Sequence, residues 1–103
     1  MPRPRKDRYC RAFDGDAVFK PRTIPMTDLI TVELRLSELE AMRLCDLEGL
    51  GQEEAGRRMG ISRGTVQRLL KAGREKTVQA LISNQALVIR KGEEDAHLRA
   101  NGE

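Results

Sequence analysis

The segment EEAGRRMGISRGTVQRLL, which runs from Glu53 to Leu70, constrains the fold of this 103-residue chain more than any other. It places Gly56 and Gly60 four residues apart among helix formers, although Gly costs a helix interior about 1 kcal/mol relative to Ala. Gly60 fits a sharp turn between two helices, because Gly accepts a positive φ without steric cost. Gly56 fits a point where a second helix crosses closely, because only Gly or Ala lets the two backbones approach. The spacing therefore predicts a helix-turn-helix whose turn residues are Gly56 and Gly60.

Apolar periodicity predicts three helices in the middle of the chain. The first should span residues 37–48, because Ser37 and Glu40 have the spacing of a capping box and Gly49 allows a left-handed end. The second should span residues 52–59, and the third should begin at the cap Ser62 and reach about residue 82. The expected inner faces contain Leu39, Ala41, Met42, Leu44 and Cys45 in the first helix, and Val66, Leu69, Leu70, Gly73, Thr77, Ala80 and Leu81 in the third.

Three short segments predict a small β-sheet. Residues 31–36, TVELRL, alternate apolar and polar side chains, which is typical of a half-buried strand. Residues 86–90, ALVIR, form a short apolar run, and residues 9–13 include two aromatic side chains that a small core would use. The expected fold is therefore mainly α: a helix-turn-helix of three or four helices, with a small β-sheet from N-terminal, pre-helix and C-terminal strands.

Charge is unevenly distributed along the chain, although the net charge is only +3. Residues 1–11 contain five basic residues and one acidic residue, and residues 52–76 contain seven basic and three acidic residues. Residues 37–51, between these blocks, carry one basic and four acidic residues. Two basic blocks separated by an acidic one indicate a polarised surface.

Composition also divides the chain into segments. We expect residues 1–7 to be a basic flexible arm, residues 8–92 a single helix-turn-helix domain, and residues 93–103 a polar disordered tail. No apolar run reaches the roughly 18 residues of a membrane span. The basic start lacks the apolar stretch of a secretory signal. We therefore expect no membrane partner and a cytoplasmic, nucleoid-associated protein.

Residues suited to catalysis or metal binding are sparse. Cys10 and Cys45 have no CxxC context, and the single His, His97, lies in the polar tail, so neither a zinc site nor a disulfide scaffold is expected. We expect both thiols to be reduced and at least half-buried. No carboxylate pair, phosphate-binding glycine loop or nucleophile with a base partner is recognisable. The sequence predicts no enzyme, no metal and no cofactor.

The polar face of the third helix favours a nucleic-acid partner. The glycine pattern alone leaves an ordinary helical hairpin as an alternative. This face, however, carries long hydrogen-bond donors and no acidic residue before Glu75, whereas a solvated face normally mixes both signs of charge. The donors are Arg63, Thr65, Gln67, Arg68, Lys71 and Arg74.

These residues resemble two known groups of proteins. SRGTVQRLLKAGREK is similar to the recognition helix of sigma-factor region-four helix-turn-helix domains, which bind promoter DNA. The whole chain, except about its last ten residues, resembles the family called domain of unknown function 134, whose members are predicted DNA-binding proteins of bacteria and archaea. Gly56 and Gly64 depart from the family pattern, in which Ala is usual at the first position and a polar residue is commoner at the second. The motifs that carry the resemblance are RPRK at 3–6, FKP at 19–21, SELEAMRLCDLEGLGQEEAGRRMGISRGTVQRLL at 37–70 and ALVIRKG at 86–92.

The resemblance implies a transcriptional regulator that binds double-stranded DNA sequence-specifically, with a recognition helix over residues 62–82 in the major groove. By match to the sigma-like motif, the base-reading residues are Arg63, Gln67 and Arg68. The expected phosphate contacts are Gln52, Ser62, Thr65, Lys71 and Arg74 in the helices and Arg3, Arg5 and Lys6 in the arm. Thr65 fits a thymine methyl group equally well.

Several alternatives stay open. Arg57 and Arg58 form either a solvated face or i,i+4 pairs with the preceding glutamates. The arm at residues 3–6 enters an adjacent minor groove, follows the phosphate backbone or only keeps the chain soluble. A homodimer is expected, because one helix-turn-helix reads only a few base pairs. The main alternative function is a sigma-like interaction module that contacts the transcription machinery through the acidic helix over residues 37–48.

Overall fold

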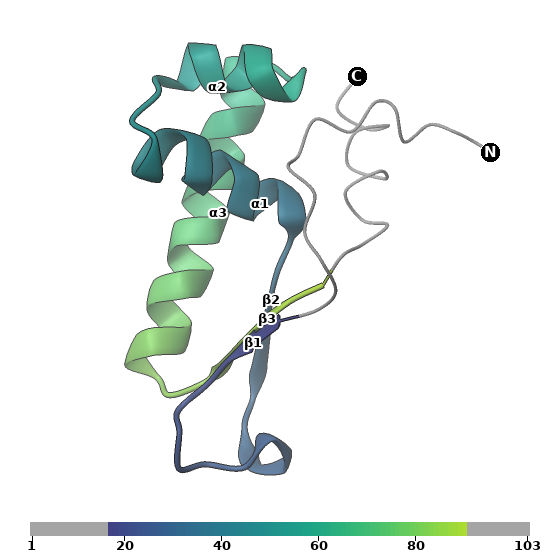
Figure 1. Cartoon of the computed structure of the whole chain (residues 1–103), viewed down its shortest axis with the longest axis vertical. Helices are drawn as coiled ribbons and strands as arrows, with labels where there is room; N and C mark the ends of the chain where they lie inside the picture. The colour runs from purple at the N-terminus through teal and green to yellow at the C-terminus, as the bar shows by residue number, and fades with distance from the viewer. Residues whose placement is uncertain (1–16, 91–103) are drawn as a thin grey trace, which may run out of the picture.

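The computed structural model describes residues 17–90, in which three helices stand beside and above a three-stranded sheet (Figure 1). The long helix α3 starts next to α2 and extends down along the sheet (Figure 1). The helices are α1 (Leu36–Met42), α2 (Gln52–Met59) and α3 (Arg63–Ile82), with a short 3-10 helix η2 (Met26–Asp28) and a π-helical turn η3 (Arg43–Leu47) that continues α1. The strands are β1 (Ala17–Phe19), β2 (Thr31–Leu34) and β3 (Ala86–Ile89). The prediction of a mainly α fold with a small sheet is confirmed.

The sheet has the strand order β1-β3-β2 and is mixed. β3 pairs antiparallel with β1 and parallel with β2, so that Ile89 lies opposite Ala17 on one side and Leu34 on the other. A parallel pair needs a long crossover, and the whole helical segment from α1 to α3 supplies it. The pairing of β2 with β3 thereby joins the segment before α1 to the segment after α3.

The start of α1 differs from the sequence prediction. The backbone N–H of Arg35 donates to the Glu38 carboxylate (2.9 Å), which caps the helix, so β2 ends at Leu34 and α1 starts at Leu36. The predicted strand to residue 36 and the predicted capping box of Ser37 and Glu40 are therefore wrong. Ser37 lies inside the helix with its hydroxyl buried, and that hydroxyl has no hydrogen-bond partner among residues 17–90.

Other boundaries agree with the prediction. α2 spans Gln52–Met59, and the Ser62 hydroxyl caps α3 by accepting the backbone N–H of Thr65 (3.2 Å). Gly49 has φ +80°, the left-handed conformation expected after the first helix. The predicted strand at residues 9–13 lies outside the described residues, as do the arm, the tail, Cys10 and His97. Among the described residues, β1 is the most N-terminal strand of the sheet.

The core forms two connected clusters. One lies between the three helices and contains Ala41, Leu44, Ala55, Met59, Val66, Leu69 and Leu70. The other lies between α1 and the sheet and contains Leu34, Leu36 and Ile89. Leu81, predicted to face inward, is 73% exposed, because the buried stripe of α3 passes through its neighbour Ala80 and one further residue turns the side chain by about 100°. Within residues 17–90, no helix combines the length and apolarity needed to cross a membrane.

Candidate functional site

The turn between α2 and α3 sets the direction in which α3 continues from α2. Gly60 has φ +74°, which ends α2 in the left-handed conformation that favours Gly. A Cβ at Gly56 would lie 2.7 Å from the carbonyl oxygen of Ile61, so even Ala could not fit without a shift. The closest approach at Gly56 is therefore to the backbone of the turn, and the crossing helix α3, which the sequence indicated, comes next with the Val66 side chain at 3.5 Å.

A second close approach sets the exposed face of α3. α1 crosses α3 at Gly73, where a Cβ would lie 3.1 Å from the sulfur of Met42 and 3.3 Å from Cβ of Glu38. The opposite face of α3 is left in solvent. It carries Arg63, Gln67, Arg68, Lys71 and Arg74, all exposed, while Thr65 is half-buried at its edge.

The first two turns of α3 hold positive charge without compensation. Arg68 donates from Nη2 to the hydroxyl of Thr65 (3.1 Å), which lies 3.0 Å from the hydroxyl of Ser62. Within residues 17–90, no acidic side chain forms an ion pair with Arg63 or Arg68. The structure thus brings four of the predicted site residues, Ser62, Thr65, Arg63 and Arg68, to the same end of the helix.

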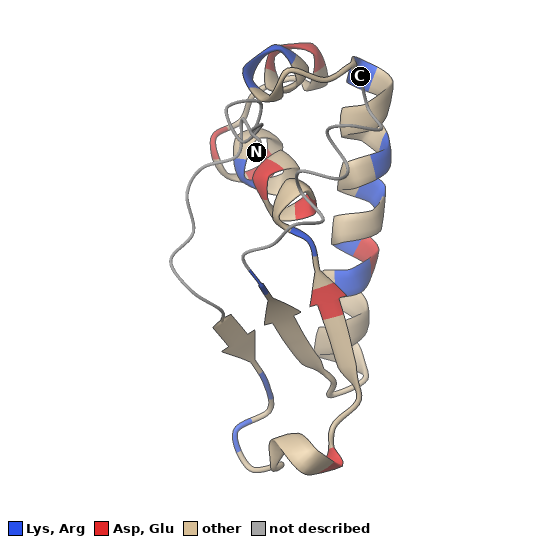
Figure 2. Ribbon diagram, turned by 90° about the vertical axis from the view of Figure 1, so that its right-hand side faces the viewer, with Lys and Arg blue, Asp and Glu red and all other residues tan. Residues whose placement is uncertain are grey.

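Farther along α3, each basic residue has an acidic partner. Lys71 pairs with Glu75 (2.6 Å) on the same helix, and Lys76 donates to both carboxylate oxygens of the buried Glu38 (2.9 and 3.0 Å). The guanidinium of Arg74 makes two hydrogen bonds with the carboxylate of Asp46 (2.7 and 3.1 Å). In Figure 2 the blue segments that mark basic residues of α3 lie along its upper and middle turns, and the ribbon of its lowest turns is tan.

The pair of Arg74 and Asp46 shifts the pKa of both groups. The hydrogen bond from Arg74 lowers the pKa of the Asp46 carboxyl, and the same bond raises the pKa of the guanidinium. Both side chains keep the charged state in this contact. A phosphate contact by Arg74 therefore has to replace an existing charged partner.

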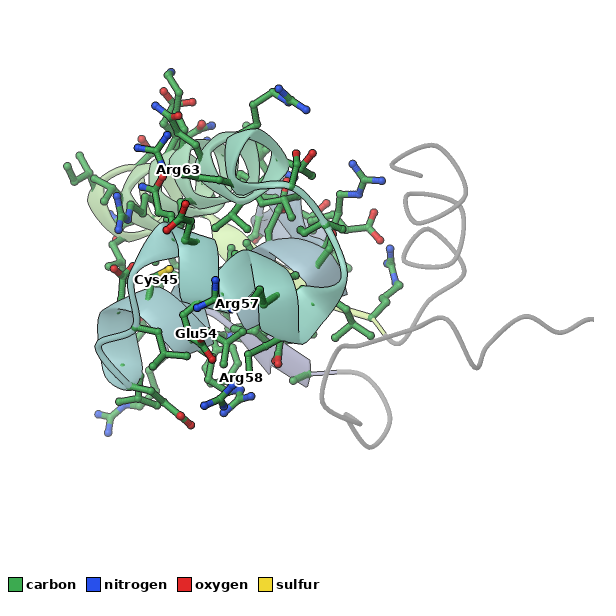
Figure 3. All side chains as sticks on the ribbon, turned by 90° about the horizontal axis from the view of Figure 1, so that it is seen from above. Cys45, Glu54, Arg57, Arg58 and Arg63 are labelled. Carbon is green, nitrogen blue, oxygen red and sulfur yellow. The ribbon has the colours of Figure 1, made fainter. Side chains whose placement is uncertain are left out.

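α2 presents a different kind of basic surface. Arg57 and Arg58 both form ion pairs with Glu54, Arg58 at i,i+4 with an Nε to Oε2 distance of 3.2 Å and Arg57 at i,i+3. The hydrogen bond from Arg57, followed by that from Arg58, lowers the pKa of Glu54. Figure 3 shows Glu54 and Arg58 on the side of α2 away from Arg63. The alternative of i,i+4 pairs is therefore met by Arg58, whereas Arg57 pairs with Glu54 at i,i+3.

Gln52 occupies the first position of α2 and is partly buried. Its side-chain oxygen is buried and has no hydrogen-bond partner among the described residues. Only the NH₂ group of a glutamine donates, so a phosphate contact would use that group and leave the oxygen where it is. Arg3, Arg5 and Lys6, the predicted contacts of the arm, lie outside the described residues.

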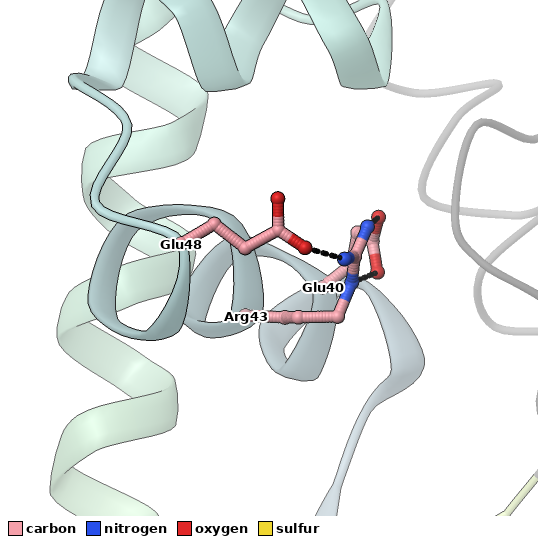
Figure 4. Close-up of polar contacts among 3 residues, drawn as sticks. All are labelled: Glu40, Arg43 and Glu48. Atoms are coloured by element: carbon pink, nitrogen blue, oxygen red, sulfur yellow. Dashed lines mark hydrogen bonds and ion pairs between the residues drawn. The ribbon is translucent and has the colours of Figure 1, made fainter.

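The acidic segment of α1 and η3 is occupied by internal partners. Arg43 hydrogen-bonds to the buried Glu40 (2.8 and 3.0 Å) and also pairs with Glu48 (Figure 4). The bond to Glu40 is the main cause of the raised pKa of Arg43. With Glu38 bound to Lys76 and Asp46 bound to Arg74, none of the four carboxylates of this segment lacks a basic partner.

The described residues were also expected to contain neither a reactive thiol nor a metal site. Cys45 is free and half-buried, and burial is the main cause of the raised pKa of its thiol, which disfavours the reactive thiolate. Within residues 17–90, no group of His, Cys, Asp and Glu side chains is arranged to hold a metal ion.

The chain has clear relatives. The UPF0251 protein of Pelotomaculum thermopropionicum is 48% identical over 92 residues, which cover 89% of this chain and 70% of the relative. The UPF0251 protein of Halothermothrix orenii is 48% identical over 87 residues, covering 84% of this chain and 64% of the relative. That of Desulforudis audaxviator is 46% identical over 92 residues, covering 89% and 60%. The chain spans less than two thirds of the length of the last two relatives, and no solved structure matches it.

A family profile matches almost the whole chain. It covers residues 1–97 and carries the description "Protein of unknown function DUF134". The names of the relatives state no activity, so function has to be argued from the arrangement of side chains. Profile and relatives together establish that this chain belongs to the family described as protein of unknown function DUF134.

Proposed function

We propose that this protein binds double-stranded DNA sequence-specifically, as a transcriptional regulator, with α2, the turn and α3 acting as a helix-turn-helix. The observation that carries the proposal is the N-terminal half of α3. There Arg63, Gln67 and Arg68 are exposed, and no acidic partner among the described residues compensates the two arginines. Such a surface favours an anionic ligand with hydrogen-bond acceptors.

The dimensions of α3 fit a groove. Its 20 residues make a rod of about 30 Å, and the major groove of B-DNA, about 12 Å wide, admits one α-helix. The first turns of the recognition helix are the ones that meet base edges in helix-turn-helix proteins. In this position Arg63 and Arg68 reach guanine, which offers two acceptors, and Gln67 reaches adenine.

Phosphate contacts would flank this reading surface. Ser62 at the start of α3 and the NH₂ group of Gln52 at the start of α2 sit at helix N-termini, where the backbone favours anions. Lys71 and Arg74 extend the same face, but each already has a carboxylate partner. Their contribution to DNA affinity is therefore smaller than their charge suggests, since a phosphate must replace Glu75 or Asp46.

A second candidate function is a sigma-like interaction module that contacts the transcription machinery through the acidic segment of α1 and η3. One observation favours it: Leu47 is 79% exposed on η3 and lies between Asp46 and Glu48. The internal ion pairs of these two carboxylates speak against a surface that offers free acidic groups. We therefore place DNA binding first.

Selection of bound sequences from a random duplex pool, followed by footprinting on the selected site, tests the proposal. We expect enrichment of a short guanine-containing sequence, and a palindromic site would add that the protein binds as a homodimer. Enrichment should disappear when Arg63 and Arg68 are both changed to Ala. If the wild-type protein enriches no sequence and binds no duplex at low salt, DNA binding is ruled out, and cross-linking through position 47 would then test the interaction module.

A further inference from the structure

Three side chains at the start of α3 form one hydrogen-bonded chain. The hydroxyl of Ser62 accepts the backbone N–H of Thr65 (3.2 Å) and lies 3.0 Å from the hydroxyl of Thr65. The hydroxyl of Thr65 in turn accepts a hydrogen bond from Nη2 of Arg68 (3.1 Å). Thr65 thus links the helix cap to the guanidinium of Arg68. We call Ser62, Thr65 and Arg68 the donor cluster.

The hydrogen atoms of the donor cluster determine which ligand it can take. A hydroxyl has one hydrogen to donate and two lone pairs to accept with. The contact between the two hydroxyls uses one of their two hydrogens, whichever residue donates. The other hydroxyl hydrogen and most of the guanidinium N–H groups are therefore left for an acceptor outside the cluster. Three of the four hydroxyl lone pairs already accept hydrogen bonds within the cluster, so the cluster offers mainly donors and favours a ligand that presents acceptors.

Gly64 leaves this donor cluster open. A Cβ at Gly64 would lie 3.9 Å from Nη1 of Arg68 and 4.0 Å from the hydroxyl oxygen of Ser62, and apart from its chain neighbours and the backbone of α3 it would meet no other described atom within 4 Å. A side chain would therefore fit without a clash, but it would stand over the donors. Packing does not require Gly here, although it costs the helix about 1 kcal/mol relative to Ala. Close approach of a ligand to the cluster explains why the position has no side chain.

We infer that Thr65 is a positioning residue for base reading: its hydroxyl holds the guanidinium of Arg68 for contact with a guanine edge, and Gly64 keeps the path to that edge clear. The inference rests on the proposed function. Guanine presents two acceptors, O6 and N7, in the major groove, which match the forked donors of Arg. A guanidinium fixed before binding loses less rotamer freedom when the contact forms. Thr65 then acts through Arg68, and not by direct contact with phosphate.

Two substitutions at position 65 test this role. Thr65→Val removes the hydroxyl, keeps the shape and leaves the backbone N–H that Ser62 caps, so the melting temperature should stay close to that of the wild type. Thr65→Ser keeps the hydroxyl and is the matched control. On the selected duplex we expect Thr65→Val to bind about fivefold to tenfold more weakly and Thr65→Ser to bind like the wild type. On a random duplex all three should bind equally.

A modified base ties the effect to guanine. Replacing the contacted guanine by 7-deazaguanine removes the N7 acceptor, so the wild type should fall toward the affinity of Thr65→Val, and Thr65→Val should change less. If Thr65→Val binds the selected duplex as tightly as the wild type, the positioning role is overturned while DNA binding stands. If it weakens selected and random duplexes equally, Thr65 contacts phosphate and the inference is also overturned. If the wild type binds no duplex, both proposals fall.

Discussion

The first and second parts of the exposed face of α3, residues 63–70 and 71–82, differ sharply, although they belong to one helix, and we call them its first and second half. In the first half, Arg63 and Arg68 have no acidic partner among residues 17–90. In the second half, Lys71 and Arg74 are ion-paired, and the last turns expose apolar side chains instead. These side chains are Val78, Leu81 and Ile82, with exposed fractions of 51%, 73% and 75%.

The difference comes from what packs against each half. α1 and η3 lie against the middle of α3, and they bring Glu38 and Asp46 within reach of Lys76 and Arg74. The first turns of α3 instead follow the turn after α2. Glu54, which lies in α2, is already bound to Arg57 and Arg58. A run of basic residues in a sequence is therefore a poor measure of free positive charge. The neighbours in the fold decide which cations remain available to a ligand.

The largest expected effect comes from disrupting the turn between α2 and α3, which presents the first half of the exposed face of α3. Gly56→Val should lower the free energy of unfolding by about 3 kcal/mol, because its Cβ would stand 2.7 Å from the carbonyl oxygen of Ile61 and the backbone of the turn must move. Gly64→Ala is the matched control, since its Cβ makes only ordinary van der Waals contacts at 3.9 and 4.0 Å, and it should stabilise the protein slightly. Urea unfolding of both variants measures the difference. Equal stability of the two would mean that α2 and the turn are less tightly packed than the structure indicates.

The next effect separates the two halves directly. Arg68→Ala should cost about 1–3 kcal/mol of binding free energy on a selected duplex and little on a random one, because a base contact is lost. Lys71→Ala should weaken binding to both duplexes slightly and equally, because Lys71 is already paired with Glu75 (2.6 Å). Paired titrations of each variant on both duplexes provide the measurement. A uniform loss for Arg68→Ala would assign that side chain to phosphate.

A smaller effect is expected when a cation of the second half loses its acidic partner, so that this half resembles the first in free positive charge. Asp46→Asn removes the charge that holds Arg74, so affinity for any duplex should rise a few-fold, and the slope of log K against log salt should steepen by about one. Glu48→Gln is the matched control, because it removes a carboxylate that pairs with Arg43 on η3 and leaves Arg74 untouched. An unchanged salt slope in Asp46→Asn would show that Arg74 does not approach DNA.

Local signals predicted much of the helical unit. Gly60 and Gly49 have the positive φ that their positions after a helix suggest, and Ser62 caps α3 through its side chain. These features depend on interactions within a few residues, which a sequence pattern records directly. The start of α1 differs from the prediction because the acceptor that caps it is Glu38, which serves the N-cap Arg35, and this pair lies two residues before the expected pair of Ser37 and Glu40.

The electrostatics of the site were not predictable in the same way. Arg74 and Asp46 are 28 residues apart in sequence, and Lys76 and Glu38 are 38 residues apart. An i,i+4 spacing cannot predict these two pairs, because they form only after α1 packs on α3 at Gly73. Sequence spacing could therefore indicate a pair within α3, such as Lys71 with Glu75, but only the fold shows that Arg74 and Lys76 are paired as well.

The smallest expected effect concerns the pH dependence of stability. Arg74 lowers the pKa of Asp46 below its unfolded value, so the stabilisation by this pair is fully present above the unfolded pKa, near pH 4, and is lost as pH falls through the lower folded pKa. The Asp46 side chain is 44% exposed, which limits the contribution to at most about 1 kcal/mol. Melting temperatures of the wild type and Asp46→Asn should therefore differ slightly at pH 7 and converge as pH falls through the lowered folded pKa of Asp46. If the difference in melting temperature persists in acid, Asp46 stabilises η3 through something other than its charge. The contact between Arg74 and Asp46 would then depend on packing.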